Sequence, residues 1–304
     1  MAKQAKTRDT SLFLPTTAAE LSARGIGQLD FVYIIGDAYV DHPSFGPAII
    51  SRVLESHGYT VGILSQPDWH SAEAFRRLGR PRLAFLISAG NIDSMVNHYT
   101  SAKKRRSSDA YTPGGEAGKR PDRATIVYAN RAREAYRGVP VILGGIEASL
   151  RRFAHYDYWD DKVRRSILSD SGADLLIYGM GERQIVEIAD ALAGGLPAEQ
   201  ITYVNGTCYM THSLERVYEY ETIESYEAVA RDKNAYAAAF MAQYREQDAI
   251  RGKRLVQPHG DAFLVVNPPA APLTTEELDA VYELPYTREP HPAYQKEIPA
   301  LFEV

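Results

Sequence analysis

The fold is decided by one stretch near the beginning of the chain, Leu29-Asp30-Phe31-Val32-Tyr33-Ile34-Ile35-Gly36-Asp37. Its almost continuous apolar run predicts a central strand, because strands of a parallel sheet are covered on both faces. Gly36 and Asp37 end the run and open the loop to the next element. We therefore expect a buried strand whose carboxyl end carries a tight turn.

Four more apolar runs of strand length follow, and segments with helical periodicity separate them. We predict strands over residues 29–35, 60–64, 82–87, 139–143 and 173–178, and helices over 46–58, 71–78, 122–136, 147–170 (one or two) and 183–193. This alternation predicts an α/β fold with a parallel sheet and helices on both faces, because right-handed crossovers leave few other arrangements. We expect a flavodoxin- or Rossmann-like five-stranded sheet with strand order 2-1-3-4-5.

The rest of the chain divides by composition. Residues 1–28 are expected to be a loose lead-in, and residues 29–195 form the α/β domain, with a polar insertion at 92–121. Residues 196–304 are expected to be a helical and extended linker or cover region. Within it we predict an extended segment at 200–221, one long helix over 225–252, a strand at 262–266 and a short helix at 275–282.

The bulk properties narrow the functional classes. The 304 residues carry a net charge of −5, so no global positive field attracts nucleic acid or an anionic membrane. The single cysteine, Cys208, excludes an internal disulfide and a CxxC metal pair. The most apolar stretch is too short to cross a bilayer and the chain begins without a signal-peptide pattern, so we expect a cytoplasmic protein with no membrane partner.

The predicted ligand site lies at the carboxyl ends of the strands, where open parallel sheets bind ligands. Glycine there lets a ligand approach the backbone, and each following helix offers free N–H groups. One glycine pair alone is more typical of a tight turn, but two pairs on successive strands favour a ligand. We predict no catalytic or metal-binding residue, and eleven cofactor-binding residues: Gly36, Asp37, Tyr39, His42, Asn91, Gly144, Gly145, Glu147, Gly179, Gly181 and Glu182.

The usual nucleotide fingerprints are absent from the sequence. No GxGxxG follows the first strand, and residues 114–120 fail the P-loop pattern because Pro113 stands where its first glycine should be. His42 lies on the loop where a ligand would sit, although a surface histidine is the simpler interpretation. A self-sufficient nucleotide enzyme would need a phosphate loop and a general base, and we identify neither.

A basic run at 103–106 marks the polar insertion. A solvated loop is the usual interpretation of such a run, and contact with phosphate or RNA is the alternative. Further cations could join it: Lys119, Arg120, Arg123, Arg151, Arg152, Arg164 and Arg165.

Several separate blocks resemble a known family. Residues 141–148 with 173–182 look like the cobalamin-binding-type domain that precedes many radical SAM barrels. Residues 36–46, 88–100, 151–159 and 258–261 resemble the YgiQ-type radical SAM proteins, so the resemblance covers essentially the whole chain.

The resemblance implies reductive cleavage of S-adenosylmethionine at a 4Fe-4S cluster. Such a cluster needs three thiolates in a CxxxCxxC spacing, which we expect after Val304 in a longer parent protein. The chain then resembles an accessory N-terminal module, truncated before that motif and inactive alone, whose partner is the downstream radical SAM barrel. Cobalamin is the cofactor that the resemblance implies for residues 29–195. The alternative is a non-enzymatic RNA- or nucleotide-binding α/β module.

Overall fold

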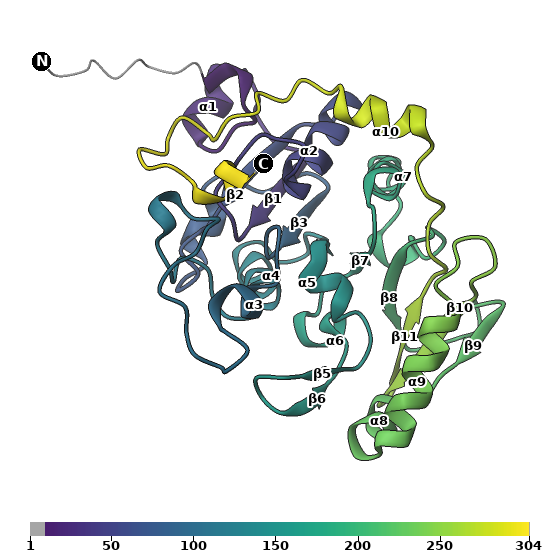
Figure 1. Cartoon of the computed structure of the whole chain (residues 1–304). Helices are drawn as coiled ribbons and strands as arrows, with labels where there is room; N and C mark the ends of the chain where they lie inside the picture. Colours follow the sequence, from purple (N-terminus) through teal and green to yellow (C-terminus); the bar gives the residue numbers. More distant parts are fainter. Residues whose placement is uncertain (1–9, 304) are drawn as a thin grey trace, which may run out of the picture.

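The computed structural model describes residues 10–303, and in them one sheet of nine strands carries helices on both faces (Figure 1). The strand order is β2-β1-β3-β4-β7-β8-β11-β10-β9. Its first five strands run parallel and lie in the predicted order 2-1-3-4-5: β1 (Phe31–Ile35), β2 (Val61–Ser65), β3 (Ala84–Ser88), β4 (Val141–Leu143) and β7 (Leu175–Ile177).

The sheet then continues into the region that was expected to be a linker or cover. Strand β8 is antiparallel to β7 and to β11, β11 is antiparallel to β10, and β10 is parallel to β9. The bounds of these strands are Thr207–Thr211 (β8), Tyr220–Thr222 (β9), Arg254–His259 (β10) and Ala262–Val266 (β11). The prediction of a purely parallel sheet of five strands is therefore wrong in number and in direction. The division of the chain at residue 195 stays a prediction.

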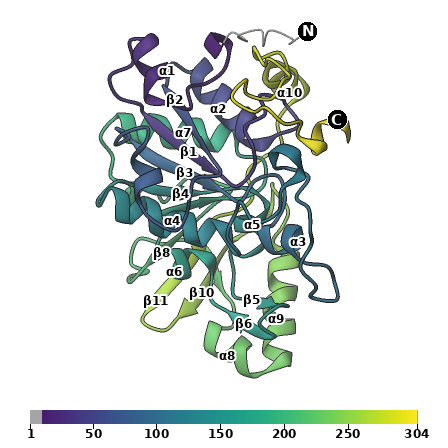
Figure 2. The same ribbon diagram turned by 90° about the vertical axis from the view of Figure 1, so that its left-hand side faces the viewer.

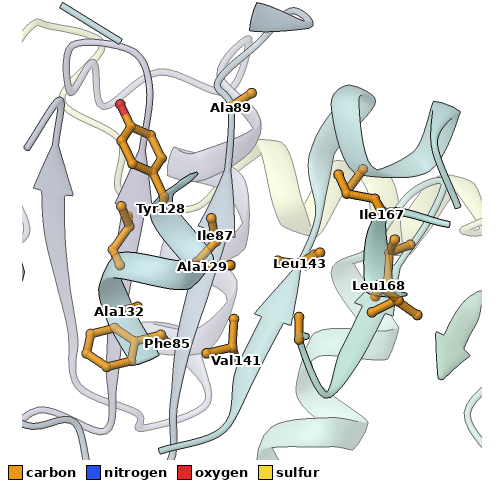
Figure 3. Close-up of a cluster of buried hydrophobic side chains, with 14 of the residues drawn as sticks. Phe85, Ile87, Ala89, Tyr128, Ala129, Ala132, Val141, Leu143, Ile167 and Leu168 are labelled. Atoms are coloured by element: carbon orange, nitrogen blue, oxygen red, sulfur yellow. The ribbon is translucent and has the colours of Figure 1, made fainter. Parts of the chain in front are cut away.

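Two layers of helices bury the parallel strands. Helices α2 (Gly46–Ser56) and α7 (Glu182–Ala193) cover one face, and α4 (Ala124–Ala135) and α6 (Ile167–Ser171) cover the other. Figure 3 shows the second face, where Ala129 and Ala132 of α4 lie beside Phe85 and Ile87 of β3. Small residues let the helix approach the strands closely, and large strand side chains fill the space.

The remaining short elements depart from the prediction in places. Residues 147–170 hold α5 (Gly145–Leu150) and a hairpin, β5 (His155–Asp157) and β6 (Lys162–Arg164), before α6. The helix predicted at 71–78 is a single 3-10 turn, Glu73–Arg76. The expected lead-in contains α1 (Ala18–Ala23), while residues 1–9 lie outside the described part. Two further helices are α3 (Ser94–His98) and α10 (Thr275–Tyr282). None of the helices described between residues 10 and 303 is long and apolar enough to cross a membrane.

The long helix predicted over 225–252 is two helices, α8 (Tyr226–Arg231) and α9 (Lys233–Arg245). Asp232 separates them with an extended backbone, φ −126° and ψ 121°, and its side chain accepts a hydrogen bond from the Asn234 N–H. A short acidic side chain stabilises a helix start better than a helix interior. The helical pattern of apolar residues continues on both sides of Asp232, so the sequence predicted one helix.

A C-terminal segment, residues 285–300, returns across the loop after β1, and we call it the C-terminal strap (Figures 1 and 2). Its backbone pairs with that loop through Asp41 N–H to Glu289 O at 3.0 Å and His291 N–H to Tyr39 O at 3.0 Å. Ile298 packs with Val40 in a small apolar cluster. The strap therefore joins the end of the described chain to the loop after β1.

Candidate functional site

A cavity of about 440 Å³ opens at the carboxyl ends of β1, β3, β4 and β7. Its volume is in the range of small-molecule sites, and its position is where parallel sheets bind ligands. Strand residues such as Tyr33, Leu86 and Ile142 form its floor. Six of the eleven predicted residues line it: Asn91, Gly144, Gly145, Gly179, Gly181 and Glu182.

Glycine keeps the turns after β4 and β7 open. Gly145 has φ +80°, and a Cβ atom there would lie 3.2 Å from the Cβ of Ser88. Gly179 has φ +75° with no heavy atom within 4 Å of the place its Cβ would take. At Gly145 the positive φ and the close approach to Ser88 both favour glycine, whereas at Gly179 only the positive φ does and the space beside the backbone is open.

Glu182 is the charged group of the cavity. It stands in the first turn of α7, where a carboxylate is favoured by the helix dipole, and its side chain is only 9% exposed. One carboxylate oxygen, Oε2, is buried with no hydrogen-bond partner among the described residues. A buried carboxylate oxygen without a hydrogen-bond donor is uncommon, and Glu182 borders another pocket as well as this cavity.

Asn91 ties two loops together at the cavity rim. Its side chain donates to Ser44 O at 3.0 Å and accepts from the Gly46 N–H at 3.3 Å. Its backbone N–H donates to Asp37 Oδ2 at 2.6 Å. The loop after β3 therefore holds the start of α2 in place.

Asp37 and Gly36 lie beneath the cavity and do not line it. The Arg120 guanidinium lies 2.8 Å from Asp37 Oδ1 and 2.9 Å from Asp109 Oδ2, with all three side chains buried. Burial raises the pKa of Asp37 to about 6, and the positive charge of Arg120 opposes that rise. A Cβ on Gly36 would lie 2.1 Å from the Ala89 carbonyl oxygen, so glycine is needed there for packing.

Tyr39 and His42 are also outside the cavity lining. Tyr39 is buried by the C-terminal strap, its ring stacked on His291 at 5.8 Å, and its hydroxyl accepts from the Leu14 N–H at 3.2 Å. His42 accepts from the Ser44 N–H through Nδ1 at 3.1 Å, and partial burial lowers its pKa. Since the strap covers the first half of this loop, only the second half, from Ser44, reaches the cavity.

Glu147 is a buried structural anchor. Its carboxylate accepts from the Ser94 N–H at 2.8 Å and from the Ser94 hydroxyl at 2.5 Å. It also accepts from the Thr125 N–H at 2.9 Å. One carboxylate thus accepts hydrogen bonds from N–H groups in the first turns of both α3 and α4. These bonds leave the Glu147 side chain little freedom to bind a cofactor.

The rim of the cavity carries exposed apolar side chains. Ile146 and Met180 line the cavity and are 50% and 51% exposed, and Leu150, one helical turn after Ile146 on α5, is 66% exposed. Single exposed apolar residues are ordinary, but two at a cavity with a third one turn away are typical of a contact surface. We call these three residues the apolar rim.

Most cations of the predicted basic patch are paired with acidic residues, so fewer positive charges are free than the sequence indicates. Residues 103–106 are exposed, and Lys103 lies over the Tyr158 ring at 4.8 Å from its centre. Most other predicted cations are held in ion pairs within the protein: Lys119, Arg120, Arg123, Arg151, Arg164 and Arg165. Arg152 is the exception among the described members of that set.

A comparison with protein families identifies the family of this chain. Residues 13–304, nearly the whole chain, match the family model described as radical SAM N-terminal. The chain belongs to the radical SAM N-terminal family. The family assignment agrees with the resemblance seen in the sequence.

Full-length relatives of this radical SAM N-terminal chain are about twice as long. A UPF0313 protein of Clostridium perfringens (strain ATCC 13124) is 58% identical over 286 residues, which cover 94% of this chain and 43% of the relative. A UPF0313 protein of Clostridium botulinum (strain 657) is 56% identical over 294 residues, which cover 96% and 46%. The chain thus spans less than half the length of the curated relatives it matches.

The radical SAM context implies an iron–sulfur cluster and S-adenosylmethionine in the parent protein, but this chain does not fit the cluster. Within residues 10–303, no group of three or more His, Cys, Asp or Glu is placed to hold a metal ion. Cys208 is fully buried in the sheet, and burial raises the pKa of its thiol to about 12. A protonated, inaccessible thiol is not a cluster ligand.

Cobalamin stays a prediction for this radical SAM N-terminal chain. A lower histidine ligand would have to come from His42, which does not reach the cavity lining. The described residues therefore do not fit cobalamin bound through that histidine.

Sequence reasoning missed Ile146, Met180 and Arg120. Ile146 and Met180 lie next to predicted glycines, so an apolar residue in a turn that faces the ligand site could have identified them. Arg120 was read as part of a basic loop, although its burial between two acids makes it the centre of the cavity's support. Charge alone does not distinguish a solvated arginine from a buried one.

Proposed function

We propose that this chain is the accessory domain of a longer radical SAM protein, and that it binds a small ligand and docks through the carboxyl edge of its sheet. The observation that carries the proposal is the family match over residues 13–304 in a chain that spans less than half of its relatives. An α/β domain without cluster ligands supplies binding and positioning rather than radical chemistry.

The proposed docking surface is the apolar rim around the cavity mouth. Ile146, Leu150 and Met180 would lose their contact with water when another domain covers the cavity. The partner that we propose is the radical SAM barrel of the same parent protein. Docking there would enclose the cavity ligand between the two domains, which strengthens its polar contacts by excluding water.

The catalytic part of the proposal is tested with the chain alone. After anaerobic treatment with iron and sulfide, we expect the chain to retain no cluster and to cleave no S-adenosylmethionine under reducing conditions. The full-length Clostridium perfringens relative, carried through the same steps, is the matched comparison. Cleavage of S-adenosylmethionine by the chain alone would contradict the proposal.

A second candidate function is RNA binding through the exposed run at 103–106. These four cations form no ion pair with acidic residues in the described part of the chain, so they are available to phosphate. Electrophoretic retention of RNA that weakens with salt, and that is lost when Lys104, Arg105 and Arg106 become Ala, would support this function. Retention unchanged by those substitutions would exclude this surface.

A further inference from the structure

A second cavity, of about 330 Å³, lies beside the first one and is built around Arg152. The end of α9, the strands β10 and β11 and the residues after β7 enclose it. Its polar lining comes from distant parts of the sequence, with Ser149 and Arg152 in one segment and Gln243, Gln247 and Lys253 about a hundred residues later. None of these five polar residues lines the first cavity.

Arg152 is a half-buried cation that no described carboxylate neutralises. Its guanidinium lies over the Tyr178 ring at 4.7 Å and near the Phe153 ring at 5.2 Å. Nη1 donates to the Ser149 carbonyl at 2.6 Å, whereas Nε is buried with no partner among the described residues. Aromatic contacts hold the planar group in one orientation and leave a donor unused.

The neighbouring arginine shows what a structural arginine does in this region. Arg151 is buried and forms an ion pair with Asp93, the N-cap of α3. An uncompensated cation in a half-buried place is costly unless a counter-charge reaches it. Arg152, in contrast, has no acidic partner among the described residues and contacts the Ser149 carbonyl and two aromatic rings.

The charges that line the cavity favour an anion. Arg152 and Lys253 are cationic, and Glu246 is the acidic member of the lining. The Glu246 carboxylate already accepts a hydrogen bond from the backbone N–H of Lys253 at 2.7 Å. The balance is one positive charge, and two glutamine amides add neutral donors.

We propose that this cavity is an anion-binding site, in which the Arg152 fork binds the carboxylate or phosphate group of a small molecule. Planar bidentate contacts of this kind are the usual way in which arginine recognises both groups. Gly179 lines both cavities and has free space at its Cβ position. The two cavities therefore share one boundary residue.

The test titrates the 304-residue chain by calorimetry with two probes, inorganic pyrophosphate and citrate, at constant ionic strength. We expect one saturable site for at least one probe, and the stronger probe identifies phosphate or carboxylate as the preferred group. Arg152→Met should weaken binding roughly tenfold or more, because charge-assisted hydrogen bonds are lost. Arg77→Met, which removes an exposed arginine outside the cavity, should leave it unchanged.

Thermal unfolding of the same variants separates a binding role from a structural one. Because Arg152 has no described acidic partner, Arg152→Met should keep or raise the melting temperature in the absence of probe, and only the native chain should gain stability with probe. The proposal is overturned if neither probe shows a saturable site, or if Arg152→Met binds as the native chain does. A melting temperature lowered by the substitution, with no effect of either probe on the native chain, would make Arg152 a structural residue.

Discussion

Beneath the cavity, Arg120 shares its guanidinium between two buried carboxylates. It lies 2.8 Å from Asp37 and 2.9 Å from Asp109, and Nη1 donates to the Ala89 carbonyl at 2.8 Å. Asp37 in turn accepts from the Asn91 N–H at the cavity rim. One buried cation therefore positions the loops after β1 and β3, although it does not touch the cavity.

Replacing Arg120 by Met should destabilise the chain by about 3–5 kcal/mol at pH 8, because two buried carboxylates lose their partner. Burial already raises the pKa of Asp37 to about 6, and removal of the guanidinium raises it further. A carboxyl whose folded-state pKa exceeds its unfolded value takes up a proton on folding, so its effect on stability becomes less favourable as pH rises through the folded pKa. The difference between variant and native chain should therefore shrink from pH 8 to pH 5.

Urea unfolding at both pH values measures this difference, with the exposed neighbour substitution Lys119→Met as control. Subtracting the native chain removes the contribution of histidines, which titrate in the same range. An equal loss at pH 5 and pH 8 would mean that the buried carboxyls are not the source of the destabilisation.

At the scale of elements, the C-terminal strap explains which candidate residues reach the cavity. Tyr39 was predicted from its place after the first strand, but its ring packs on His291, 252 residues later. Glu147 was predicted from its place after β4, but it anchors Ser94 and Thr125. Sequence position identifies the sheet edge, whereas side-chain partners from distant segments decide which residues face a ligand.

Among the polar contacts that hold the strap, those of the Tyr294 hydroxyl can be removed by a single substitution. The Tyr294 hydroxyl accepts from the Tyr39 N–H at 2.8 Å and pairs with the Ser65 hydroxyl at 2.8 Å. Tyr294→Phe should lower the free energy of unfolding by about 1–3 kcal/mol, because the Tyr39 N–H stays buried without an acceptor. Chemical denaturation measures the loss, and Tyr203→Phe at an exposed tyrosine is the matched control. Equal stabilities of the two variants would show that this contact does not hold the strap.

At the scale of the molecule, local signals predicted the parallel half of the sheet and its strand order. Apolar runs, glycine turns and helical periodicity lie within a few residues of one another, so they are readable in sequence. The antiparallel half depends on pairing between β8 and β11, whose partners Cys208 and Val266 are 58 residues apart. Such pairing cannot be seen in any local pattern. The same holds for the cavity of Arg152, whose lining comes from five segments: 149–153, 178–179, 243–247, 253–255 and 266–269.

We propose that the carboxyl edge of the sheet docks against the remainder of a longer radical SAM protein. The most direct measurement is biolayer interferometry between this chain and the remainder of the Clostridium perfringens relative, expressed separately and shown to be folded by circular dichroism. We expect saturable binding that Ile146→Glu or Met180→Glu weakens roughly tenfold or more by placing a charge in an apolar contact. Leu12→Glu, at an exposed leucine outside the apolar rim, should bind as the native chain does. Absence of binding, or binding that the two rim substitutions leave unchanged, would contradict the claim.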